Sequence, residues 1–487
     1  MVSLYTNETA FFADIADELR LFLAMEEIVP AEGMNVSGNS AAVVLEEKDG
    51  LWHVMARICL DGREAVSVYE RPAVSGDALE EKRCRKRAVK IAAFRAMREA
   101  TGLVLPWGSL TGIRPTRLLR ELIEREGGKE ALRMMREDFD VTPEKLSLAS
   151  EIVGVQMPIL RTQTKADADI YIGIPYCASR CLYCSFASQV RTKKTDMAAY
   201  LAALERDISH GARIIKETGR NVRSMYLGGG TPTVLTAEEL DRLLDHALCA
   251  YGGFGTEFTV EAGRPDTITE EKFKVLRKYG VGRVSINPQS MNARTLELIG
   301  RSHSPESIVT AFNMARNAGF DSINMDVIAG LPGETPEDMR RTLDAIVALG
   351  PDNLTVHTLA LKRSSRLVEK LDEYPLPEAE AAEEMVSLGA EAAKALQMKP
   401  YYMYRQKYMR GNLENVGYAK AGKECIYNID MMEDTTSIMA HGAGAMTKCI
   451  YDAERRVERV PNPKNIETYI EKIDRLAEEK LRLYSIG

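Results

Sequence analysis

Six short runs of apolar and β-branched residues recur between residues 170 and 361, and stretches with helical periodicity separate successive runs. Strands that alternate with helices favour repeated βα units over hairpins, and such units form a parallel sheet with right-handed crossovers. Active sites of these sheets lie at the carboxyl ends of the strands. The pattern therefore predicts an α/β fold, an incomplete (β/α)6 barrel. The strands are expected at residues 170–174, 223–227, 257–261, 283–287, 322–328 and 353–361.

The first part of the chain has a mixed pattern. An amphipathic stretch at residues 11–23 and a basic helical stretch at 82–100 flank two alternating stretches, at 41–45 and 52–58. Alternation is typical of half-buried strands, so a small α+β domain is predicted. The polar, aperiodic residues 161–169 predict a linker between this domain and the barrel.

The end of the chain breaks the βα rhythm. A long helix is expected at residues 377–396, followed by an alternating tyrosine-rich tract, and the charged, periodic residues 465–483 predict a surface helix. We therefore expect three domains. They are an N-terminal α+β accessory domain (1–165), the partial barrel (166–375) and a small, mostly helical C-terminal domain (376–487).

Composition is ordinary for a globular protein. Of the 487 residues, 45% are hydrophobic and 28% are charged, which excludes wholesale disorder. No uninterrupted apolar run reaches roughly eighteen residues, and acids interrupt the apolar pattern of the N-terminus, so we expect a soluble, cytoplasmic protein without a membrane segment. The net charge of −7 argues against a chain that coats nucleic acid or a membrane as a whole.

Three of the eight cysteines, Cys177, Cys181 and Cys184, lie in one short loop after the first predicted strand. Structural zinc sites usually close with four nitrogen or sulfur ligands, and this loop has three. Three thiolates on a [4Fe-4S] cluster leave one iron free to bind a substrate or cofactor. The loop therefore predicts a catalytic iron–sulfur cluster, with zinc or unligated thiols as the alternatives. The other cysteines are expected to be buried, reduced thiols: Cys59, Cys84, Cys249, Cys425 and Cys449.

The segment CASRCLYC resembles the three-cysteine signature of the radical S-adenosylmethionine (SAM) superfamily. The resemblance implies a radical SAM barrel in which the open iron binds the amino and carboxylate groups of SAM. It also implies that one electron from the reduced cluster cleaves SAM to a 5′-deoxyadenosyl radical. A reducing electron donor such as flavodoxin or ferredoxin is then an expected partner.

Glycines and polar residues follow the later predicted strands. The GGGT run at residues 228–231 follows the second strand, where glycines allow a ligand to approach the backbone closely. A bare tight turn is the alternative interpretation of this run. Polar side chains at strand ends are expected to face the cavity, where a buried carboxylate needs a donor such as a ribose hydroxyl. The residues at or after strands three to six are Glu261, Gln289, Asp326 and Ala360.

Further motifs resemble those of the oxygen-independent coproporphyrinogen III oxidase family, also called coproporphyrinogen dehydrogenases. The motifs span residues 168–446 and are YLGGGTPT, VEAGRPD, NPQS, GRSHS, NMDVIAGLPGETPED and a C-terminal addition. The segments WGSLTGIRPTRLL and YYMYRQKYMRGNLENVGYAK look closer to a longer, HemZ-like branch of that family. The C-terminal domain is accordingly expected to resemble that of the oxidases.

The resemblance assigns roles to residues of this chain, motif by motif. Cys177, Cys181 and Cys184 would bind the cluster, and Tyr171 and Arg301 are the candidate catalytic residues. Cofactor contacts are implied for Tyr171, Tyr183, Gly229, Gly230, Thr231, Glu261, Gln289, Arg301, Asp326, Ala360 and Met446.

The resemblance also implies a tetrapyrrole substrate and a place in anaerobic haem biosynthesis. The radical would remove a hydrogen from a propionate β-carbon, carbon dioxide would leave and an electron acceptor would take the remaining electron. Two propionates would become vinyl groups in this way, so that coproporphyrinogen III becomes protoporphyrinogen IX. Two positions depart from the oxidases: Phe186 replaces a fourth cysteine, and Gly173 replaces a histidine. Related haem chaperones also lack that cysteine. A haem-binding chaperone and another radical reaction on a tetrapyrrole are therefore the alternatives.

A tetracarboxylate substrate needs cationic donors, and the planar guanidinium group of arginine binds carboxylates with two hydrogen bonds. Solvated surface charge is the alternative role for each candidate cation. The candidates are Lys362, Arg363, Arg366, Arg405 and Lys407.

Aromatic and histidine side chains are further candidates for contact with a tetrapyrrole. The tyrosines of the C-terminal tract can line a pocket, but their alternation is also typical of a half-buried strand, which is the interpretation that we favour. The two histidines can act as haem ligands or proton donors, and a structural role is favoured for both. These residues are Tyr401, Tyr402, Tyr404, Tyr408, His357 and His441.

Residues 82–100 contain eight Lys or Arg residues and one acid, a local charge of +7. A basic helix face of this kind can meet nucleic acid, an acidic electron donor or an anionic substrate, and a solvated helix is the alternative. No nucleic-acid-binding motif accompanies the stretch, so a nucleic-acid partner is not expected.

Overall fold

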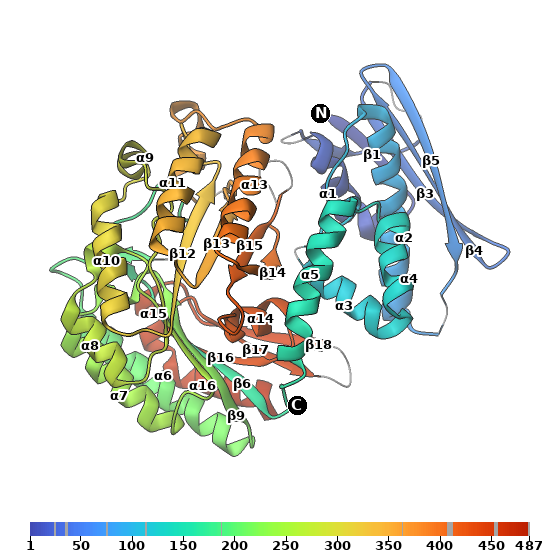
Figure 1. The fold of residues 1–487 in the computed structure, drawn as a ribbon. Coiled ribbons are helices and arrows are strands. Elements are labelled where there is room, and N and C mark those ends of the chain that lie inside the picture. The colour runs from blue at the N-terminus through green and yellow to red at the C-terminus, as the bar shows by residue number, and fades with distance from the viewer. Residues whose placement is uncertain are drawn as a thin grey trace. The chain divides into compact units, whose positions relative to one another are not determined.

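The computed structural model describes residues 1–487 except 24–25, 35–37, 75, 113, 187, 363, 407–412, 452–455 and 486–487. The chain forms two compact units, Met1–Ser150 and Glu151–Gly487, and each is described by itself (Figure 1). The three-domain division at 165/166 and 375/376 stays a prediction. Among the helices of the described residues, none has both the length and the apolar character that a membrane span needs.

The N-terminal unit has the expected α+β architecture. Its elements are β1 (Val2–Thr6), η1 (Thr9–Phe11), α1 (Phe12–Leu23), β2 (Ile28–Pro30), β3 (Ser40–Lys48), β4 (Leu51–Leu60), β5 (Arg63–Pro72), α2 (Ala78–Thr101), α3 (Pro115–Glu126), α4 (Gly128–Arg133) and the π-helical turn η2 (Met134–Asp138). Helix α5 (Pro143–Leu160) begins in this unit and ends in the next. The sheet order is β2-β1-β3-β4-β5.

Helix α2 packs its apolar face on this sheet. Ala88 and Val89 are buried in the same core as Trp52 and Val54 of β4. The Asp77 side chain caps the N-terminus of the helix, because it accepts hydrogen bonds from the backbone N–H groups of the first turn. The basic stretch 82–100 is therefore the body of a well-capped helix, and its opposite face carries the charges.

The second unit contains the predicted partial barrel. Six parallel strands lie side by side in chain order: β6 (Asp167–Ile174), β9 (Asn221–Gly229), β10 (Glu257–Glu261), β11 (Arg283–Ser285), β12 (Ser322–Ala329) and β13 (Asn353–Thr358). The connecting helices are α6 (Met197–Glu217), α7 (Ala237–Tyr251), α8 (Glu270–Lys278), α9 (Ala293–Leu298), α10 (Pro305–Asn317) and α11 (Pro336–Leu349). These helices follow the outside of the strands, and the barrel does not close (Figure 1).

Two strands of the barrel are shorter than predicted. Strand β11 ends at Ser285, because Pro288 has no N–H group to donate and Gln289 turns the chain with a φ of 65°. Strand β13 ends at Thr358, so Ala360 lies beyond it. Both candidate residues after these strands are thus loop residues at the carboxyl edge of the sheet. The remaining short elements are η3 (Pro232–Val234), η4 (Pro265–Thr267), α12 (Arg366–Glu369) and η5 (Leu371–Glu373).

The C-terminal region has more helical than strand residues, as expected, and its strands extend the barrel sheet. It comprises α13 (Ala379–Ala395), β14 (Lys399–Tyr404), β15 (Asn415–Ala419), α14 (Ile426–Glu433), β16 (Ser437–His441), β17 (Met446–Tyr451), β18 (Arg456–Pro461), α15 (Ile466–Glu471) and α16 (Ile473–Ser485). Strand β15 is antiparallel to β13, and β16 is parallel to β6. One sheet of eleven strands results, in the order β14-β15-β13-β12-β11-β10-β9-β6-β16-β17-β18.

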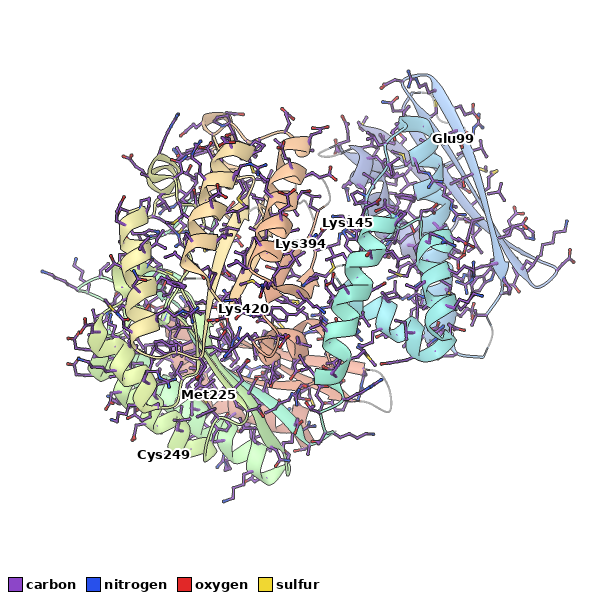
Figure 2. All side chains as sticks on the ribbon, in the orientation of Figure 1. Glu99, Lys145, Met225, Cys249, Lys394 and Lys420 are labelled. Carbon is purple, nitrogen blue, oxygen red and sulfur yellow. The ribbon has the colours of Figure 1, made fainter. Side chains whose placement is uncertain are left out.

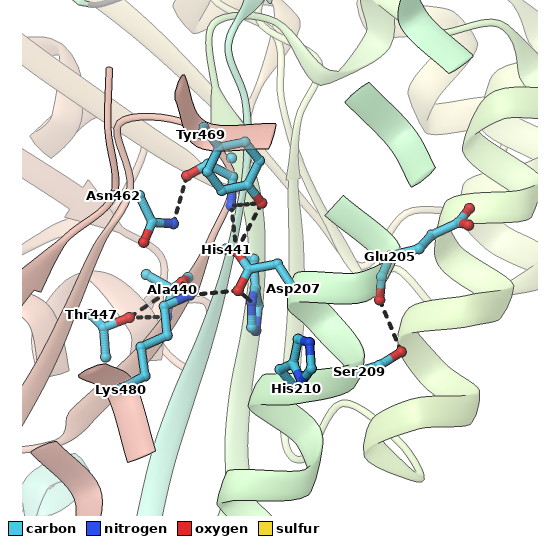
Figure 3. Close-up of polar contacts among 12 residues, drawn as sticks. Glu205, Asp207, Ser209, His210, Ala440, His441, Thr447, Asn462, Tyr469 and Lys480 are labelled. Carbon is cyan, nitrogen blue, oxygen red and sulfur yellow. Dashed lines mark hydrogen bonds and ion pairs between the residues drawn. The ribbon is translucent and has the colours of Figure 1, made fainter. Parts of the chain in front are cut away.

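The last predicted helix differs from its expected form. The stretch 465–483 divides into α15 and α16, and α16 buries one face instead of lying wholly on the surface. The Lys480 ammonium group is fully buried, where it donates to Asp207 of α6 at 2.6 Å and to the Ala440 carbonyl at 2.7 Å (Figure 3). The Tyr469 hydroxyl donates to the same carboxylate at 2.8 Å. This buried network attaches the C-terminal helices to the barrel.

Candidate functional site

The three-cysteine loop leaves the carboxyl end of β6. The two-residue strand β7 (Tyr176–Cys177) pairs with β8 (Gln189–Val190) and holds the base of the loop. All three thiols are free: Cys181 is buried, and Cys177 and Cys184 are half-buried. The loop therefore presents three sulfur ligands at the end of the sheet where the other candidate residues also lie.

Two side chains from neighbouring strand ends donate to these sulfur atoms. The Thr231 hydroxyl lies 3.5 Å from Sγ of Cys177, and the Arg264 guanidinium lies 3.9 Å from Sγ of Cys181. Donors of this kind stabilise negative charge on thiolates and on cluster sulfur atoms. The Thr231 position was predicted from the glycine-rich run. The sequence reasoning missed Arg264, although it lies inside the VEAGRPD motif that signalled this strand end.

The donor set fits an iron–sulfur cluster better than a single metal ion. Within the described residues, no three His, Cys, Asp or Glu side chains lie close enough together to hold one ion. A [4Fe-4S] cluster takes each thiolate on a different iron, so its three ligands must stand apart. Three free thiols in one loop therefore suit a cluster that keeps one iron without a protein ligand.

The glycines of the 228–230 run are required by close contacts. A Cβ atom on Gly228 would lie 3.1 Å from the Glu261 carboxyl group, and one on Gly229 would lie 3.0 Å from the Ile174 carbonyl oxygen. A Cβ atom on Gly230 would lie 2.9 Å from Sγ of Cys177. The run is therefore more than a tight turn, because it lets the cysteine loop and Glu261 approach the same backbone.

The Arg301 guanidinium is buried between the cysteine loop and the loops that follow β10 and β11. It donates to the Asn287 carbonyl at 2.6 Å, to the Gly263 carbonyl at 3.2 Å and to the Tyr183 hydroxyl at 3.4 Å. Its Nε atom is buried and has no hydrogen-bond partner among the described residues. Burial raises the pKa of Tyr183, so this phenol stays neutral. The Cys181 side chain is a further neighbour of this guanidinium, so Arg301 lies between the cysteine loop and two strand ends.

Two carboxylates lie on the inner side of the strands. The Tyr226 hydroxyl donates to Glu261 at 2.7 Å, and burial raises the pKa of Glu261 to about 7. Burial also acts to raise the pKa of Asp326, but the His357 ring, 3.6 Å away, and the Asn324 amide at 2.7 Å outweigh it and lower that pKa. The carboxyl group of Glu261 therefore has a pKa near neutral pH, whereas that of Asp326 is ionised at neutral pH.

The backbone of Gln289 makes hydrogen bonds through both its N–H and its carbonyl group, whereas the oxygen of its side chain has no partner in the described part of the chain. Its N–H donates to the Asp326 carbonyl at 2.9 Å, and its carbonyl accepts from Ile328 N–H at 3.1 Å. The side chain is buried, yet its Oε1 atom has no hydrogen-bond partner in the described part of the chain. A buried acceptor without a partner is costly unless a ligand donates to it.

Tyr171 lies within a stack of aromatic rings inside the barrel. Its ring centroid is 6.3 Å from that of Tyr226 and 6.2 Å from that of Tyr427, and burial raises the pKa of Tyr171. The sequence reasoning missed Tyr226 and Tyr427; inward alternation along β9 was the available signal for the first. Tyr427 lies on α14, a position that only the fold brings to the barrel interior.

The remaining cofactor candidates lie less centrally. Ala360 is in the loop after β13, and Met446 is half-exposed at the start of β17, two strands away from β6. Both assignments stay predictions.

The candidate cations for carboxylate binding have different surroundings. Lys362 and Arg366 are exposed in the segment after β13, and Arg405 is buried after β14. Burial lowers the pKa of Lys362, and the nearby Cys184 thiol opposes this shift. The segment that carries Lys362 and Arg366 lies beside the cysteine loop, since Ser364 accepts from Arg180 at 3.0 Å and Leu367 N–H donates to the Leu182 carbonyl at 3.0 Å. Arg363, Lys407 and Tyr408 lie outside the described residues.

Tyr401, Tyr402 and Tyr404 belong to β14, which confirms the predicted strand. The strand is not half-buried, however: Tyr401 and Tyr402 are both buried, in the core on which Tyr171 and Tyr226 pack. His441 confirms the structural role predicted for it: its ring is fully buried between Asp207, 3.2 Å from Nδ1, and the Tyr251 hydroxyl, 2.6 Å from Nε2. His357 differs, since its half-buried ring reaches Asp326 and the Tyr404 hydroxyl at 3.4 Å. His357 therefore lies at the candidate site.

The expectation of five buried thiols outside the loop is wrong in part. Cys84, Cys425 and Cys449 are buried, Cys59 is half-buried and Cys249 is exposed near the end of α7 (Figure 2). An outward helical position decides the exposure of Cys249, which composition does not reveal. Cys249 provides a matched control for substitutions of the loop cysteines.

Comparison with known proteins places this site in context. Residues 171–346 match the family model described as the radical SAM superfamily, whose members use a [4Fe-4S] cluster and SAM. The chain is 38% identical to the "oxygen-independent coproporphyrinogen-III oxidase-like protein HemZ" of Bacillus subtilis (strain 168), over 82% of this chain and 80% of the relative. It is 31% identical to the heme chaperone HemW of the same organism, over 56% of this chain and 69% of the relative.

A solved structure shows the same fold. The chain is similar to coproporphyrinogen III oxidase (HemN) from Escherichia coli, described as a radical SAM enzyme, with a TM-score of 0.53 and 23% identity. The match covers 67% of this chain and 73% of that one.

Proposed function

Because the chain belongs to the HemN/HemZ/HemW family of radical SAM proteins, we propose that it decarboxylates coproporphyrinogen III to protoporphyrinogen IX without oxygen. The observation that carries the proposal is that Arg301, Glu261 and Asp326 lie at the carboxyl edge of the sheet, from which the cysteine loop also leaves, in a chain that matches HemZ over most of its length. The proposed location is the cytoplasm, a reducing compartment in which thiols stay free.

Three cysteines would hold the cluster in this proposal. Cys177, Cys181 and Cys184 supply the sulfur ligands, and Thr231 and Arg264 donate to two of those sulfur atoms. When bound, the cluster and SAM supply a 5′-deoxyadenosyl radical that takes a hydrogen atom from the substrate. The protein's own contribution is to position the reactants and to exclude water.

The carboxylates and amide of the barrel interior would hold SAM. Asp326 is ionised and Glu261 has a pKa near neutrality, so both can accept hydrogen bonds from ribose hydroxyls or from the SAM ammonium group. Gln289 Oε1 and Arg301 Nε are among the buried atoms without a hydrogen-bond partner in the described residues, and a ligand could bind to them. A ligand that hydrogen-bonds to these atoms would recover part of the free energy lost when they are buried.

The substrate would lie against cations at the rim. Lys362 and Arg366 are exposed after β13 and can pair with propionate carboxylates. Tyr171 and Arg301 remain the proposed catalytic residues, and a flavodoxin or ferredoxin remains the proposed electron donor. The part from residue 376 to 487 is proposed to close the substrate side, as a coproporphyrinogen-oxidase-like domain.

Phe186 favours a second candidate function, delivery of haem as a chaperone. This residue stands where the oxidases have a fourth cysteine, and its side chain is 70% exposed. The 31% identity with HemW points the same way. A different radical reaction on a tetrapyrrole is the third candidate, since it would use the same cofactor residues.

Anaerobic reconstitution separates these functions. The reconstituted chain, with SAM, a reductant and coproporphyrinogen III, is expected to form 5′-deoxyadenosine and a product that has lost two carboxyl groups. Cys181→Ala should abolish cluster and turnover, and the matched Cys249→Ala should retain both. Stoichiometric haem binding without decarboxylation would support the chaperone instead, and turnover by Cys181→Ala would contradict the mechanism.

A further inference from the structure

The N-terminal unit contains a cavity of about 460 Å³ that the proposed function does not use. It lies between the end of β5, one face of α2 and the turn η2, all within residues 1–150. Its volume is in the range of small-molecule sites in proteins. The side chains that decide its chemistry are Arg71, Arg87, Arg125, Cys84 and Phe139.

The basic helix α2 supplies one wall of this cavity. Glu80, Cys84, Arg87 and Ile91 line it, and their spacing of three and four residues places them on a single helix face. The charge of residues 82–100 is therefore not wholly solvated, because Arg87 points from that stretch into the cavity.

Two of the arginines have no acidic partner. Within the described part of the chain, no carboxylate lies at ion-pair distance from Arg71 or Arg87, whereas Arg125 lies 3.6 Å from Glu80. Both guanidinium groups rest on aromatic rings instead: Arg71 lies over Trp52 at 5.9 Å and Arg87 over Phe139 at 5.7 Å. Arg71 Nε is also buried without a hydrogen-bond partner among the described residues.

The acids that line the cavity are already paired. Glu70 contacts His53 at 2.8 Å, and Asp138 contacts Arg133 at 3.5 Å. Glu80 is shared between Arg83 at 3.7 Å and Arg125. Burial lowers the pKa of Arg87; Cys84 and Glu80 oppose this shift, and the cations Arg125 and Arg71 add to it. Within the described residues, Arg71 and Arg87 are thus the two arginines of the cavity that form no ion pair.

We propose that this cavity binds a small molecule with concentrated negative charge, carried by a phosphate group or by adjacent carboxylates. Guanidinium groups form paired, charge-assisted hydrogen bonds with either anion, and the aromatic rings beneath Arg71 and Arg87 hold their planes in place. Binding of such an anion would be a function of the N-terminal unit. It is independent of the cluster and of SAM, and so of the proposed reaction.

Tryptophan fluorescence of the full-length chain gives a direct test. The chain has two tryptophans, and Arg71 lies over one of them, Trp52. Titration with pyrophosphate or with citrate should produce a saturable change with a Kd below about 1 mM, the range of weak specific binding. The two probes distinguish a phosphate ligand from a carboxylate ligand, and saturation by either supports the site.

Matched variants locate the binding. Arg87→Gln and Arg71→Gln should each weaken the affinity at least tenfold, while Lys82→Gln, an equal loss of charge at an exposed position of α2, should change it less than twofold. Circular dichroism verifies that the variants are folded, and Arg87→Lys provides a milder variant if Arg87→Gln is not. The proposal is overturned if neither anion saturates the signal, or if Arg87→Lys and Lys82→Gln both bind like the unsubstituted chain.

Discussion

Gly230 lies directly against Cys177: a Cβ atom on this glycine would be 2.9 Å from the cysteine sulfur and 2.5 Å from the Tyr176 carbonyl oxygen. Both distances are shorter than van der Waals contact, and the carbonyl belongs to the backbone that carries the cysteine. The glycine-rich strand end and the cysteine loop therefore form one structural unit, and each fixes the position of the other.

Gly230→Ala should displace Cys177 and reduce cluster binding. We expect at least a threefold lower iron content per chain after anaerobic reconstitution, because the loop backbone must move to admit the methyl group. Gly154→Ala is the matched control, since no atom lies within 4 Å of its added Cβ. A full cluster content in Gly230→Ala would show that the contact does not constrain the loop.

Arg301→Lys should weaken SAM binding although it keeps the positive charge. Lysine cannot reach two carbonyl groups and a phenol at once, as the arginine does with Asn287, Gly263 and Tyr183. We expect an increase in the SAM dissociation constant of about tenfold, corresponding to about 1.4 kcal/mol. Equilibrium binding to the reconstituted protein measures this, with the exposed Arg294→Lys as the control. Equal affinities of the two variants would remove Arg301 from the SAM site.

Glu261 should make the stability of the ligand-free protein depend on pH. Burial raises its pKa from 4.5 to about 7, so the folded chain holds a proton that the unfolded chain releases between these values. The stabilisation is fully present below pH 4.5 and is lost as the pH rises through 7, with an upper limit of about 3 kcal/mol. Urea unfolding across this window measures the effect. Glu261→Gln should flatten the profile, and an unchanged profile would contradict the assigned pKa.

The buried Lys480 and Asp207 should be stable only as a pair. Lys480→Met leaves the Asp207 carboxylate buried with a weaker set of partners, and we expect a loss of about 3 to 5 kcal/mol. The double variant Asp207→Asn, Lys480→Met should recover part of that loss. Far-UV circular dichroism in urea measures the unfolding of the chain, and the exposed Lys472→Met is the control. A double variant less stable than Lys480→Met would show that the two side chains do not interact.

Several parts of the fold and site could be predicted from sequence because their signals are local. Apolar runs separated by helical stretches predicted the six barrel strands, and alternation in the tract from Tyr401 to Tyr408 predicted a strand where β14 lies. The cysteine loop was recognised from three closely spaced thiols and from its resemblance to a known signature. Such signals can be read from the sequence because residues that are neighbours along the chain determine the alternation of a strand and the spacing of side chains within a loop.

Other features depended on contacts between distant residues. Charge predicted that the last helix lies on the surface, but Lys480 is buried, because Asp207, on a helix 273 positions earlier, supplies its counter-charge. Likewise, Arg264 reaches the Cys181 sulfur across 83 positions. A side chain's partners across such separations are set by how the sheet curves and how helices pack on it.

The sequence by itself determined the six βα units of the barrel and the cysteine-rich loop as the candidate source of sulfur ligands, since periodicity and spacing are properties of short segments. Only the tertiary structure decided which charges are buried and paired, as in Lys480, and which are half-buried with no acid of the described chain at ion-pair distance, as in Arg71 and Arg87. The physical reason is that the cost of burying a charge depends on the groups that surround it in space, and the chain brings those groups together only when it folds.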